Sequence, residues 1–426
     1  MSSGRVAYIL TAFPTVSETF VEGEFRALSQ RGLPIDLYAT RNFREIIADA
    51  DEEEDRGLEV RRSPYLFGAK ILTAATFFLF RRPRRTLGTL VRILMGNLRS
   101  PRYLGHALAL LPKSLAFARE MERRGTRHVH GTWAHYPATA AYIVSRLLGI
   151  TYSFAGHAGL DVVADQTFLA AKLRGARFVL TCHHSTRGCL ERLAPECASK
   201  IHTIYHGVTI SEIPAPGSVP RAAPPEIVSV GRLTPEKGFL DLLGACALLR
   251  DRGHSFRARI FGQGPQRPAL ERKIKRLRLG SFVSLEGIVP HRRILEILAS
   301  ATVVTLPSYL HPNLYRDGIA NVLVEAMACG TPVVSTDYDG SRELLKGGSL
   351  GILVPEKDVE QLAAAFEAML RDPEKRAAFS IQGRKRVENE FDRQRNVEVI
   401  FTLFRQALME SAENGRPVAL SDSLTG

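Results

Sequence analysis

The chain has 426 residues, and at about 150 residues per domain this length predicts two or three hydrophobic cores. Hydrophobic residues make up 45% and charged residues 24%, a balance that excludes a disordered, collagen-like or polytopic membrane chain. The five cysteines form no C-x-x-C pair, so we expect neither a disulfide framework nor a zinc ribbon, and a reducing cytosol is the default compartment. The chain runs directly into an apolar, strand-like pattern at Val6, so we expect no cleaved leader.

The positive charge is concentrated in one segment. Residues 56–127 hold 16 Lys and Arg and three acidic residues, and this excess equals the net charge of the whole chain, +13. The apolar run Leu66–Phe80 has Lys70 inside it and is shorter than the ~20 residues that a membrane-spanning helix needs. The arginine-rich residues 81–85 follow, and a second stretch then places leucine and valine on one helical face and arginine on the opposite face. The apolar set is Leu87, Leu90, Val91, Leu94 and Leu98, and the basic set is Arg85, Arg92 and Arg99.

Two interpretations of this segment remain open. A basic amphipathic stretch can lie in the headgroup layer of an anionic membrane, with residues 61–127 as the contact. Alternatively, a helical insertion packs its apolar face on its own domain. The charge of this segment is almost entirely positive, and this favours membrane contact over simple packing. We expect no nucleic-acid binding, because the segment contains no recognition motif with interleaved aromatic residues.

Strand and helix patterns alternate through residues 1–209, which predicts a doubly wound parallel sheet with the basic insertion at about 56–127. A helix is expected at about Ser17–Arg31 and another near Ala138–Leu148. The expected strands are Val6–Leu10, Ile35–Ala39, His128–His130, Tyr152–Ala155, Phe178–Cys182 and Ile201–Tyr205.

Residues 210–226 contain five prolines in seventeen positions, which predicts an interdomain linker. A second alternating series fills residues 227–385. Helices are expected at Val359–Leu370 and Ile381–Met409, with the part at 386–410 packing back on the N-terminal domain, and residues 411–426 form a polar tail. The predicted fold is α/β: two doubly wound, Rossmann-like domains that face each other across a cleft, with the carboxyl ends of the strands at the cleft.

The segment GRLTPEKG (231–238) ends the first strand of the second domain. Arg232 and Lys237, on a glycine-flanked turn into a helix, suit a diphosphate, because a guanidinium grips two oxygens and the helix start adds backbone donors. The same residues also fit a capped turn with surface cations. Gly262 and Gly264 follow the next strand and permit either close approach of a ligand or a tight turn.

The segment 317–336 combines two carboxylates with a helix start. The amides of Asn321, Val322 and Leu323 would face an anion. Glu325 could accept hydrogen bonds from ribose hydroxyls, and Asp317 from sugar hydroxyls. Alternatively, the two acidic residues only complement the positive end of the helix dipole.

Together these motifs resemble family four of the retaining, GT-B-type glycosyltransferases, in the branch that makes exopolysaccharide, colanic-acid-like and lipid-linked glycans. Further matching pieces are FPTVSETFVEGEFRAL (13–28), HGTWAHYPATAA (130–141), FAGHAGLD (154–161), IYHGV (204–208) and GILVP (351–355). The resemblance covers the chain from its first strand to its last helix, and residues 56–127 are the least assignable part.

The resemblance implies roles for individual residues. Arg232 and Lys237 would hold the donor diphosphate, with Gly262, Gly264, Asn321, Val322, Leu323 and Glu325 completing the nucleotide-sugar site. His157 would face the reacting sugar and Asp317 would bind it. The acceptor side would include Thr15, Ser17, Glu18, Thr19 and Asp161. Two positions depart from the family: Asp317 stands where most members have Glu, and residues 14–17 replace a glycine pair.

The implied activity is transfer of a sugar from a nucleotide-diphosphate donor to a lipid-linked or polysaccharide acceptor, with retention of anomeric configuration. The acceptor would be a glycan or a polyprenyl-diphosphate-linked sugar on the cytoplasmic face of the inner membrane. We expect neither a cofactor nor a metal, because cations and helix amides would neutralise the phosphates, and Asp337 and Asp339 are not expected to bind a divalent ion. The alternatives are a nucleotide-sugar epimerase or phosphorylase on the same fold, and a non-catalytic, membrane-associated scaffold.

Overall fold

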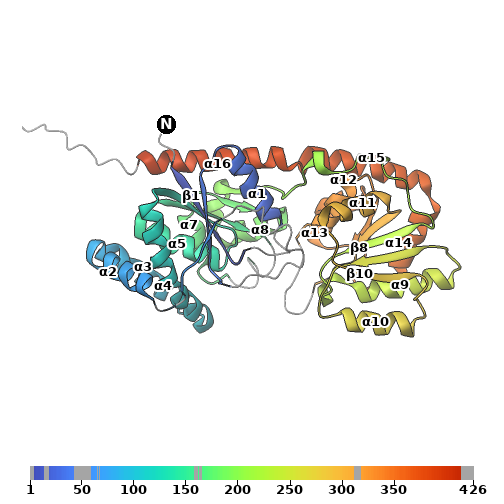
Figure 1. Cartoon of the computed structure of the whole chain (residues 1–426), viewed down its shortest axis with the longest axis horizontal. Coiled ribbons are helices and arrows are strands. Elements are labelled where there is room, and N and C mark those ends of the chain that lie inside the picture. The colour runs from blue at the N-terminus through green and yellow to red at the C-terminus, as the bar shows by residue number, and fades with distance from the viewer. Residues whose placement is uncertain are drawn as a thin grey trace, which may run out of the picture.

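The computed structural model describes residues 4–13, 19–42, 59–64, 66, 68–157, 162, 166–310 and 318–413. They form two α/β lobes that lie side by side, each built around a parallel sheet (Figure 1). The parallel strands contain nearly continuous apolar runs because helices cover both faces of each sheet. Five successive residues of the first strand, Val6–Leu10, are fully buried.

The N-terminal lobe has a seven-stranded sheet in the order β3-β2-β1-β4-β5-β6-β7. Its strands are β1 Arg5–Leu10, β2 Ile35–Ala39, β3 Val60–Arg61, β4 Thr126–Gly131, β5 Thr151–Gly156, β6 Val179–Thr181 and β7 Ile201–Thr203. Its helices include α1 Thr19–Gln30, α2 Ala69–Arg81, α3 Pro83–Asn97, α4 Pro101–Arg123, α5 Tyr136–Leu148, α7 Leu169–Gly175 and α8 His184–Leu193. The basic segment therefore supplies α2, α3 and α4, which lie together on the outer side of this lobe (Figure 1).

The C-terminal lobe has a six-stranded sheet in the order β10-β9-β8-β11-β12-β13. Its strands are β8 Glu226–Val230, β9 Arg257–Phe261, β10 Val283–Gly287, β11 Val303–Leu306, β12 Val333–Thr336 and β13 Ile352–Val354. Its helices are α9 Phe239–Asp251, α10 Arg267–Arg276, α11 His291–Ser300, α12 Asn321–Ala328, α13 Asp339–Leu344, α14 Val359–Arg371 and α15 Pro373–Glu390. Strand order reverses at β8, whose neighbours are β9 and β11, so the carboxyl end of β8 is the switch point where such sheets bind ligands.

The last helix, α16 (Arg393–Glu413), crosses from the C-terminal lobe and lies along the N-terminal lobe (Figure 1). It buries Val397, Ile400, Phe404 and Ala407 in the core formed with β1 and α1. The expected helix at 386–410 that packs back on the N-terminal domain corresponds to α16, but the expectation of one continuous helix over Ile381–Met409 is wrong, because α15 ends at Glu390 and α16 begins at Arg393. The helix is interrupted at Phe391–Asp392, where the Phe391 carbonyl accepts a hydrogen bond from the Val208 amide at 2.8 Å.

Among the described residues, no helix is both long and apolar enough to cross a membrane.

Candidate active site

The loops that follow β8 and β9 are joined by backbone hydrogen bonds. The Gly231 amide donates to the Phe261 carbonyl at 3.0 Å, and the Leu233 amide donates to the Gln263 carbonyl at 2.9 Å. Gly262 has a φ of +129°, and a Cβ placed there would lie 2.0 Å from the Gly231 carbonyl oxygen. The glycine is required because the two loops touch at this point, so the geometry of the Gly262 loop fixes the position of the Arg232 loop.

Arg232 and Lys237 lie on this assembled edge. Lys237 ends a short 3-10 turn, Pro235–Lys237, and its Cδ lies 4.0 Å from a Cβ placed on Gly231. The Arg232 side chain is 62% exposed, and its guanidinium is 4.0 Å from the Glu236 carboxylate. Both cations thus belong to one turn at the carboxyl end of the central strand, where an anionic ligand can reach them.

Helix α12 begins at Asn321, and its first turn lies between the lobes. Asn321 and Val324 line a small cavity together with Cys182 and His206 of the N-terminal lobe. Val322 and Leu323 are buried and anchor the helix start. The Leu323 amide donates to the Ala320 carbonyl at 3.0 Å and is therefore already used within this turn.

Glu325 lies one turn into α12 and is bound by a histidine. His291 Nε2 is 2.9 Å from Glu325 Oε1, and this hydrogen bond raises the pKa of His291. The carboxylate is held at a fixed position because its side chain is 15% exposed and its partner comes from α11.

On the N-terminal lobe, His157 follows β5 and is buried. Its Nε2 lies 2.7 Å from the Thr132 carbonyl, and a carbonyl can only accept, so Nε2 holds the hydrogen. In the neutral ring Nδ1 then accepts from His206 Nε2 at 3.0 Å. Trp133 packs edge-on against the ring at a centroid distance of 4.4 Å. Burial lowers the pKa of His157 to about 4, so the ring is neutral at physiological pH.

The two lobes meet directly beside this histidine. A Cβ placed on Gly318 of the C-terminal lobe would lie 3.1 Å from His183 and 3.4 Å from the His157 carbonyl oxygen. The chain next to Asp317 is therefore opposite His157. This contact brings the second motif of the C-terminal lobe to the strand ends of the N-terminal lobe.

Two carboxylates of α13 connect the lobes. Glu343 accepts hydrogen bonds from the His184 amide at 2.9 Å and from the Tyr205 hydroxyl at 2.6 Å. Asp339 accepts from the Ser185 hydroxyl at 2.9 Å. A carboxylate at the start of α8 also complements the positive end of that helix.

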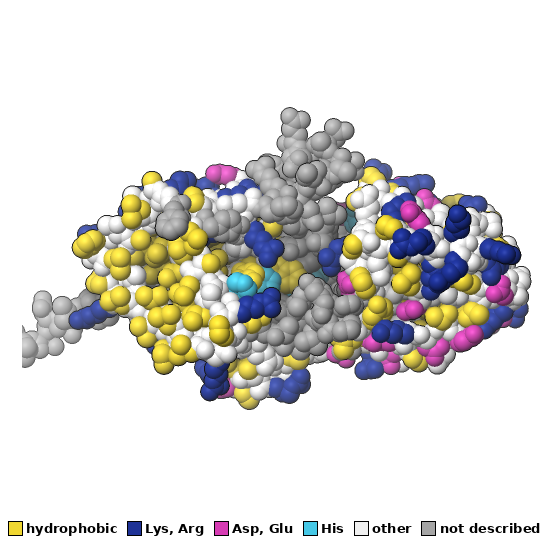
Figure 2. All heavy atoms as spheres, turned by 90° about the horizontal axis from the view of Figure 1, so that it is seen from below, with side chains coloured by type: hydrophobic (Ala, Val, Ile, Leu, Met, Phe, Trp, Pro, Cys, Tyr) yellow, Lys and Arg dark blue, Asp and Glu magenta, His cyan; other side chains and the backbone are white. Residues whose placement is uncertain are grey.

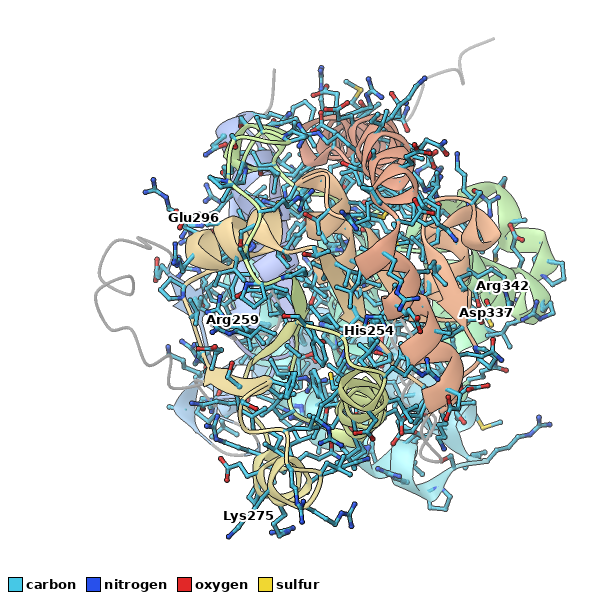
Figure 3. All side chains as sticks on the ribbon, turned by 90° about the vertical axis from the view of Figure 1, so that its right-hand side faces the viewer. His254, Arg259, Lys275, Glu296, Asp337 and Arg342 are labelled. Carbon is cyan, nitrogen blue, oxygen red and sulfur yellow. The ribbon has the colours of Figure 1, made fainter. Side chains whose placement is uncertain are left out.

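Asp337 and Asp339 are the two carboxylates of a D-x-D sequence, Asp337-Tyr338-Asp339. Asp337 pairs with Arg342 at 2.9 Å, and the two side chains lie next to each other in Figure 3. The D-x-D carboxylates thus take part in an interlobe contact and an ion pair.

A different group of side chains has metal-ligating atoms close together. Ligand atoms of His157, Cys182 and His206 all lie within 4.8 Å of one another at the ends of β5, β6 and β7. The thiol of Cys182 donates to the His157 carbonyl at 2.9 Å, and the two imidazoles share a hydrogen bond. These hydrogen bonds hold the three side chains together at the strand ends.

Several predicted site residues lie outside the described residues: Thr15, Ser17, Glu18, Asp161 and Asp317. Thr19 begins α1, and its side chain is also outside the description.

Sequence reasoning missed Trp133 and His206 as site residues and Glu343 as a contact between the lobes. Trp133 and His206 both lie within segments that match the family, HGTWAHYPATAA and IYHGV, so the signal was present. The family resemblance places Glu343 near the donor, but its contact with the other lobe has no sequence signal, because its partner on α8 lies 159 residues earlier in the chain.

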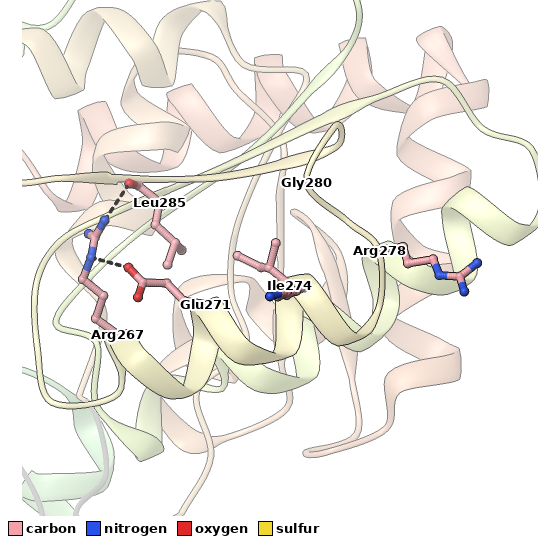
Figure 4. A pocket seen from close by; sticks show the side chains of 7 residues that line it. Arg267, Glu271, Ile274, Arg278, Gly280 and Leu285 are labelled. Atoms are coloured by element: carbon pink, nitrogen blue, oxygen red, sulfur yellow. Dashed lines mark hydrogen bonds and ion pairs between the residues drawn. The ribbon is translucent and has the colours of Figure 1, made fainter.

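One depression lies away from this region. It is on the outer side of α10, between Arg267, Ile274, Arg278 and Leu285, and the guanidinium of Arg267 bridges Glu271 and the Leu285 carbonyl there (Figure 4). None of the motif residues lines it, so it is not the candidate active site.

The fold and this arrangement of strand-end loops define the class of the protein. Sucrose-phosphate synthase from Thermosynechococcus elongatus superposes with a TM-score of 0.70 at 19% identity, covering 95% of this chain and 100% of that one. Anabaena HepE in complex with UDP and glucose superposes with a TM-score of 0.66 at 17% identity, covering 95% and 99%. These likenesses confirm the predicted two-domain GT-B fold.

Sequence comparison identifies the family. The model described as "Glycosyl transferases group 1" matches residues 216–386. Glycogen synthase of Mycobacterium tuberculosis is 30% identical over 306 residues, which cover 68% of this chain and 71% of that protein. The putative colanic acid biosynthesis glycosyltransferase WcaL of Escherichia coli is 39% identical over 199 residues, 46% of this chain and 48% of that protein. The match thus spans about half the length of WcaL. The chain belongs to the group 1 glycosyltransferases.

Proposed function

We propose that this protein transfers a sugar from a nucleotide-diphosphate donor to a glycan or lipid-linked acceptor, with retention of anomeric configuration. The observation that supports the proposal is the convergence of three features at one interlobe edge. The Arg232–Lys237 turn is joined to the Gly262 loop, α12 begins between the lobes, and a Cβ placed on Gly318 would lie 3.4 Å from the His157 carbonyl oxygen.

The donor would lie on the C-terminal lobe. Arg232 and Lys237 would neutralise the diphosphate and the charge that develops on it as the sugar leaves. The amides of Asn321 and Val322 would add donors, and the turns at Gly262 and Gly264 would border the nucleotide. Glu325, positioned by His291, would bind the ribose.

The reacting sugar would lie between His157 and Asp317. Both ring nitrogens of His157 are held, by the Thr132 carbonyl and His206, so this neutral ring would border the sugar as a fixed wall without introducing a charge near the reacting carbon. A nucleotide sugar already has a good leaving group, and the catalytic work is positioning and charge stabilisation. The departing phosphate oxygen would take the proton of the acceptor hydroxyl on the same face, which gives retention without a protein base.

The acceptor would enter from the N-terminal lobe, next to Thr15, Ser17, Glu18, Thr19 and Asp161. Similarity to WcaL and to the amylovoran biosynthesis glycosyltransferase AmsK of Erwinia amylovora, 34% identical over 169 residues that cover 40% of this chain and 42% of that protein, supports a role in exopolysaccharide assembly. We place this reaction on the cytoplasmic face of the inner membrane, where a polyprenyl-diphosphate-linked acceptor would be available.

The test is release of free nucleotide from UDP-, GDP- and ADP-sugars, with and without a short-chain polyprenyl-diphosphate-linked sugar. Transfer predicts nucleotide release that depends on the acceptor and is lost in Arg232→Ala but kept in the control Lys275→Ala, an exposed cation on α10. Conversion of the donor sugar without an acceptor would instead indicate an epimerase. Release that needs only inorganic phosphate would indicate a phosphorylase, and failure to bind any of the nucleotides would favour a scaffold.

A further inference from the structure

The outer helices of the N-terminal lobe expose an unusual number of large apolar side chains. Phe80 is 82% exposed, Leu72 69% and Met95 67%. The full set on this side is Leu66, Leu72, Leu79, Phe80, Leu87, Val91, Met95, Leu98 and Leu108, which we call the apolar face. Seen from below, hydrophobic side chains gather over this lobe, whereas the other lobe is covered by charged residues (Figure 2). A contiguous apolar face of this kind marks an interaction site.

Helix α3 packs on its own lobe through only part of its apolar surface. Ile93 is fully buried in the core of the N-terminal lobe, next to Thr89 and Asn97, whose side chains donate to carbonyls of their own helix at 2.7 and 2.8 Å. Leu87, Val91 and Leu98 are each more than half exposed. Packing on its own domain therefore leaves these large apolar side chains uncovered.

The apolar face is bordered by cations and contains no acid. No Asp or Glu occurs between Glu59 and Glu120. The exposed cations along α2, α3 and the start of α4 are Lys70, Arg81, Arg84, Arg85, Arg92, Arg99 and Arg102. A second copy of this chain would present the same positive charge and be repelled, whereas an anionic lipid surface complements both the charge and the apolar residues.

We propose that the apolar face of α2 and α3 docks on an anionic bilayer, with the helices in the headgroup layer. Arginines at its border bind lipid phosphates, and Leu72, Phe80 and Met95 insert among the acyl chains. The docking is a property of this surface and does not depend on the proposed function. Delivery of a lipid-linked acceptor by the docked enzyme does rest on the proposed function.

Vesicle flotation tests the docking, with phosphatidylcholine vesicles compared with vesicles that also contain phosphatidylglycerol. The full chain is expected to float only with the anionic vesicles. The triple variant Arg84→Gln/Arg92→Gln/Arg99→Gln should lose about 100-fold in partitioning, because each cation near such a surface contributes about fivefold. A second variant, Leu72→Ser/Phe80→Ser/Met95→Ser, should also lose binding, since its residues supply the inserted apolar area.

Control variants on the other lobe are Lys275→Gln and Ile381→Ser, of which Ile381 is 70% exposed. Both should float like the original chain. All substituted residues are exposed, so unfolding midpoints should stay unchanged and separate lost docking from lost folding. Equal flotation with neutral vesicles, or unchanged flotation of both triple variants, would overturn the proposal.

Two further measurements separate this proposal from the proposed function. Sedimentation that shows a dimer broken by the apolar variant would assign the face to a second copy and overturn the docking. Turnover with a detergent-solubilised acceptor should be the same in both triple variants. If the chain floats with anionic vesicles but releases no nucleotide, the docking is supported and only the glycosyltransferase reaction is rejected.

Discussion

Gly262→Ala tests whether the contact between the loops after β8 and β9 positions the donor cations. The new Cβ would lie 2.0 Å from the Gly231 carbonyl oxygen, whereas ordinary contact begins at 3.4 Å. The Gly231 turn must therefore shift by about 1.4 Å, and Arg232 moves with it. A misplacement of about 1 Å can cost on the order of 100-fold in rate, and we expect a loss of this size in kcat/KM.

The matched control is Gly253→Ala. Gly253 also has a positive φ, +76°, but nothing lies within 4 Å of a Cβ placed there. Gly253→Ala introduces a backbone strain of about 1–2 kcal/mol without any clash, so it measures the cost of the left-handed conformation alone. Only Gly262→Ala should weaken binding of the donor nucleotide.

The assay is calorimetric titration of both variants with UDP, GDP and ADP, followed by steady-state turnover with whichever nucleotide sugar is active. Thermal unfolding of each variant shows whether the fold is kept. A folded Gly262→Ala variant with unchanged nucleotide affinity and unchanged kcat/KM would refute the argument that the loop contact positions Arg232.

Three further substitutions test other parts of the structure. Glu343→Gln removes the charge that caps α8 from the other lobe, so stability should fall by about 1 kcal/mol, and small-angle scattering should show a larger radius of gyration. Glu24→Gln should stabilise the protein by about 1–3 kcal/mol at pH 8 and have little effect at pH 4, because burial raises the pKa of Glu24 to about 7 and its charged form is disfavoured as pH rises from 4.5. Asp36→Asn should cost about 2–4 kcal/mol at pH 7, since this buried carboxylate is held by two arginine side chains. Those hydrogen bonds outweigh its burial and lower the pKa of Asp36, so in urea titrations its stabilising effect should be present above pH 3.8 and disappear as pH falls below it.

The sheets and the strand-end loops were predictable because their signals are local. Alternating apolar strands and amphipathic helices determine a doubly wound sheet, and the residues of the GRLTPEKG turn lie next to each other in the chain. The expected strands of the N-terminal lobe match β1, β2, β4, β5, β6 and β7, although the predicted ends Cys182 and Tyr205 lie one and two residues beyond β6 and β7, and the two-residue β3 was not predicted.

Other features depend on distant contacts. The helical pattern continues through Phe391, yet the helix breaks there because the Phe391 carbonyl bonds to Val208 and its ring stacks on Tyr205 at 4.3 Å. The exposed apolar side of α3 could not be inferred from periodicity, which shows that a helix is amphipathic but not which side faces the core. Gly262 was expected to approach a ligand or form a tight turn, and the group that it approaches is another loop.

The most direct test of the central claim is nucleotide affinity measured by calorimetry for Arg232→Ala, Lys237→Ala and the control Lys275→Ala. If the two turn cations hold the donor diphosphate, each of the first two variants should bind the preferred nucleoside diphosphate at least about tenfold more weakly, a loss of about 1.4 kcal/mol, while Lys275→Ala binds normally. Undiminished affinity in both Arg232→Ala and Lys237→Ala would contradict the account.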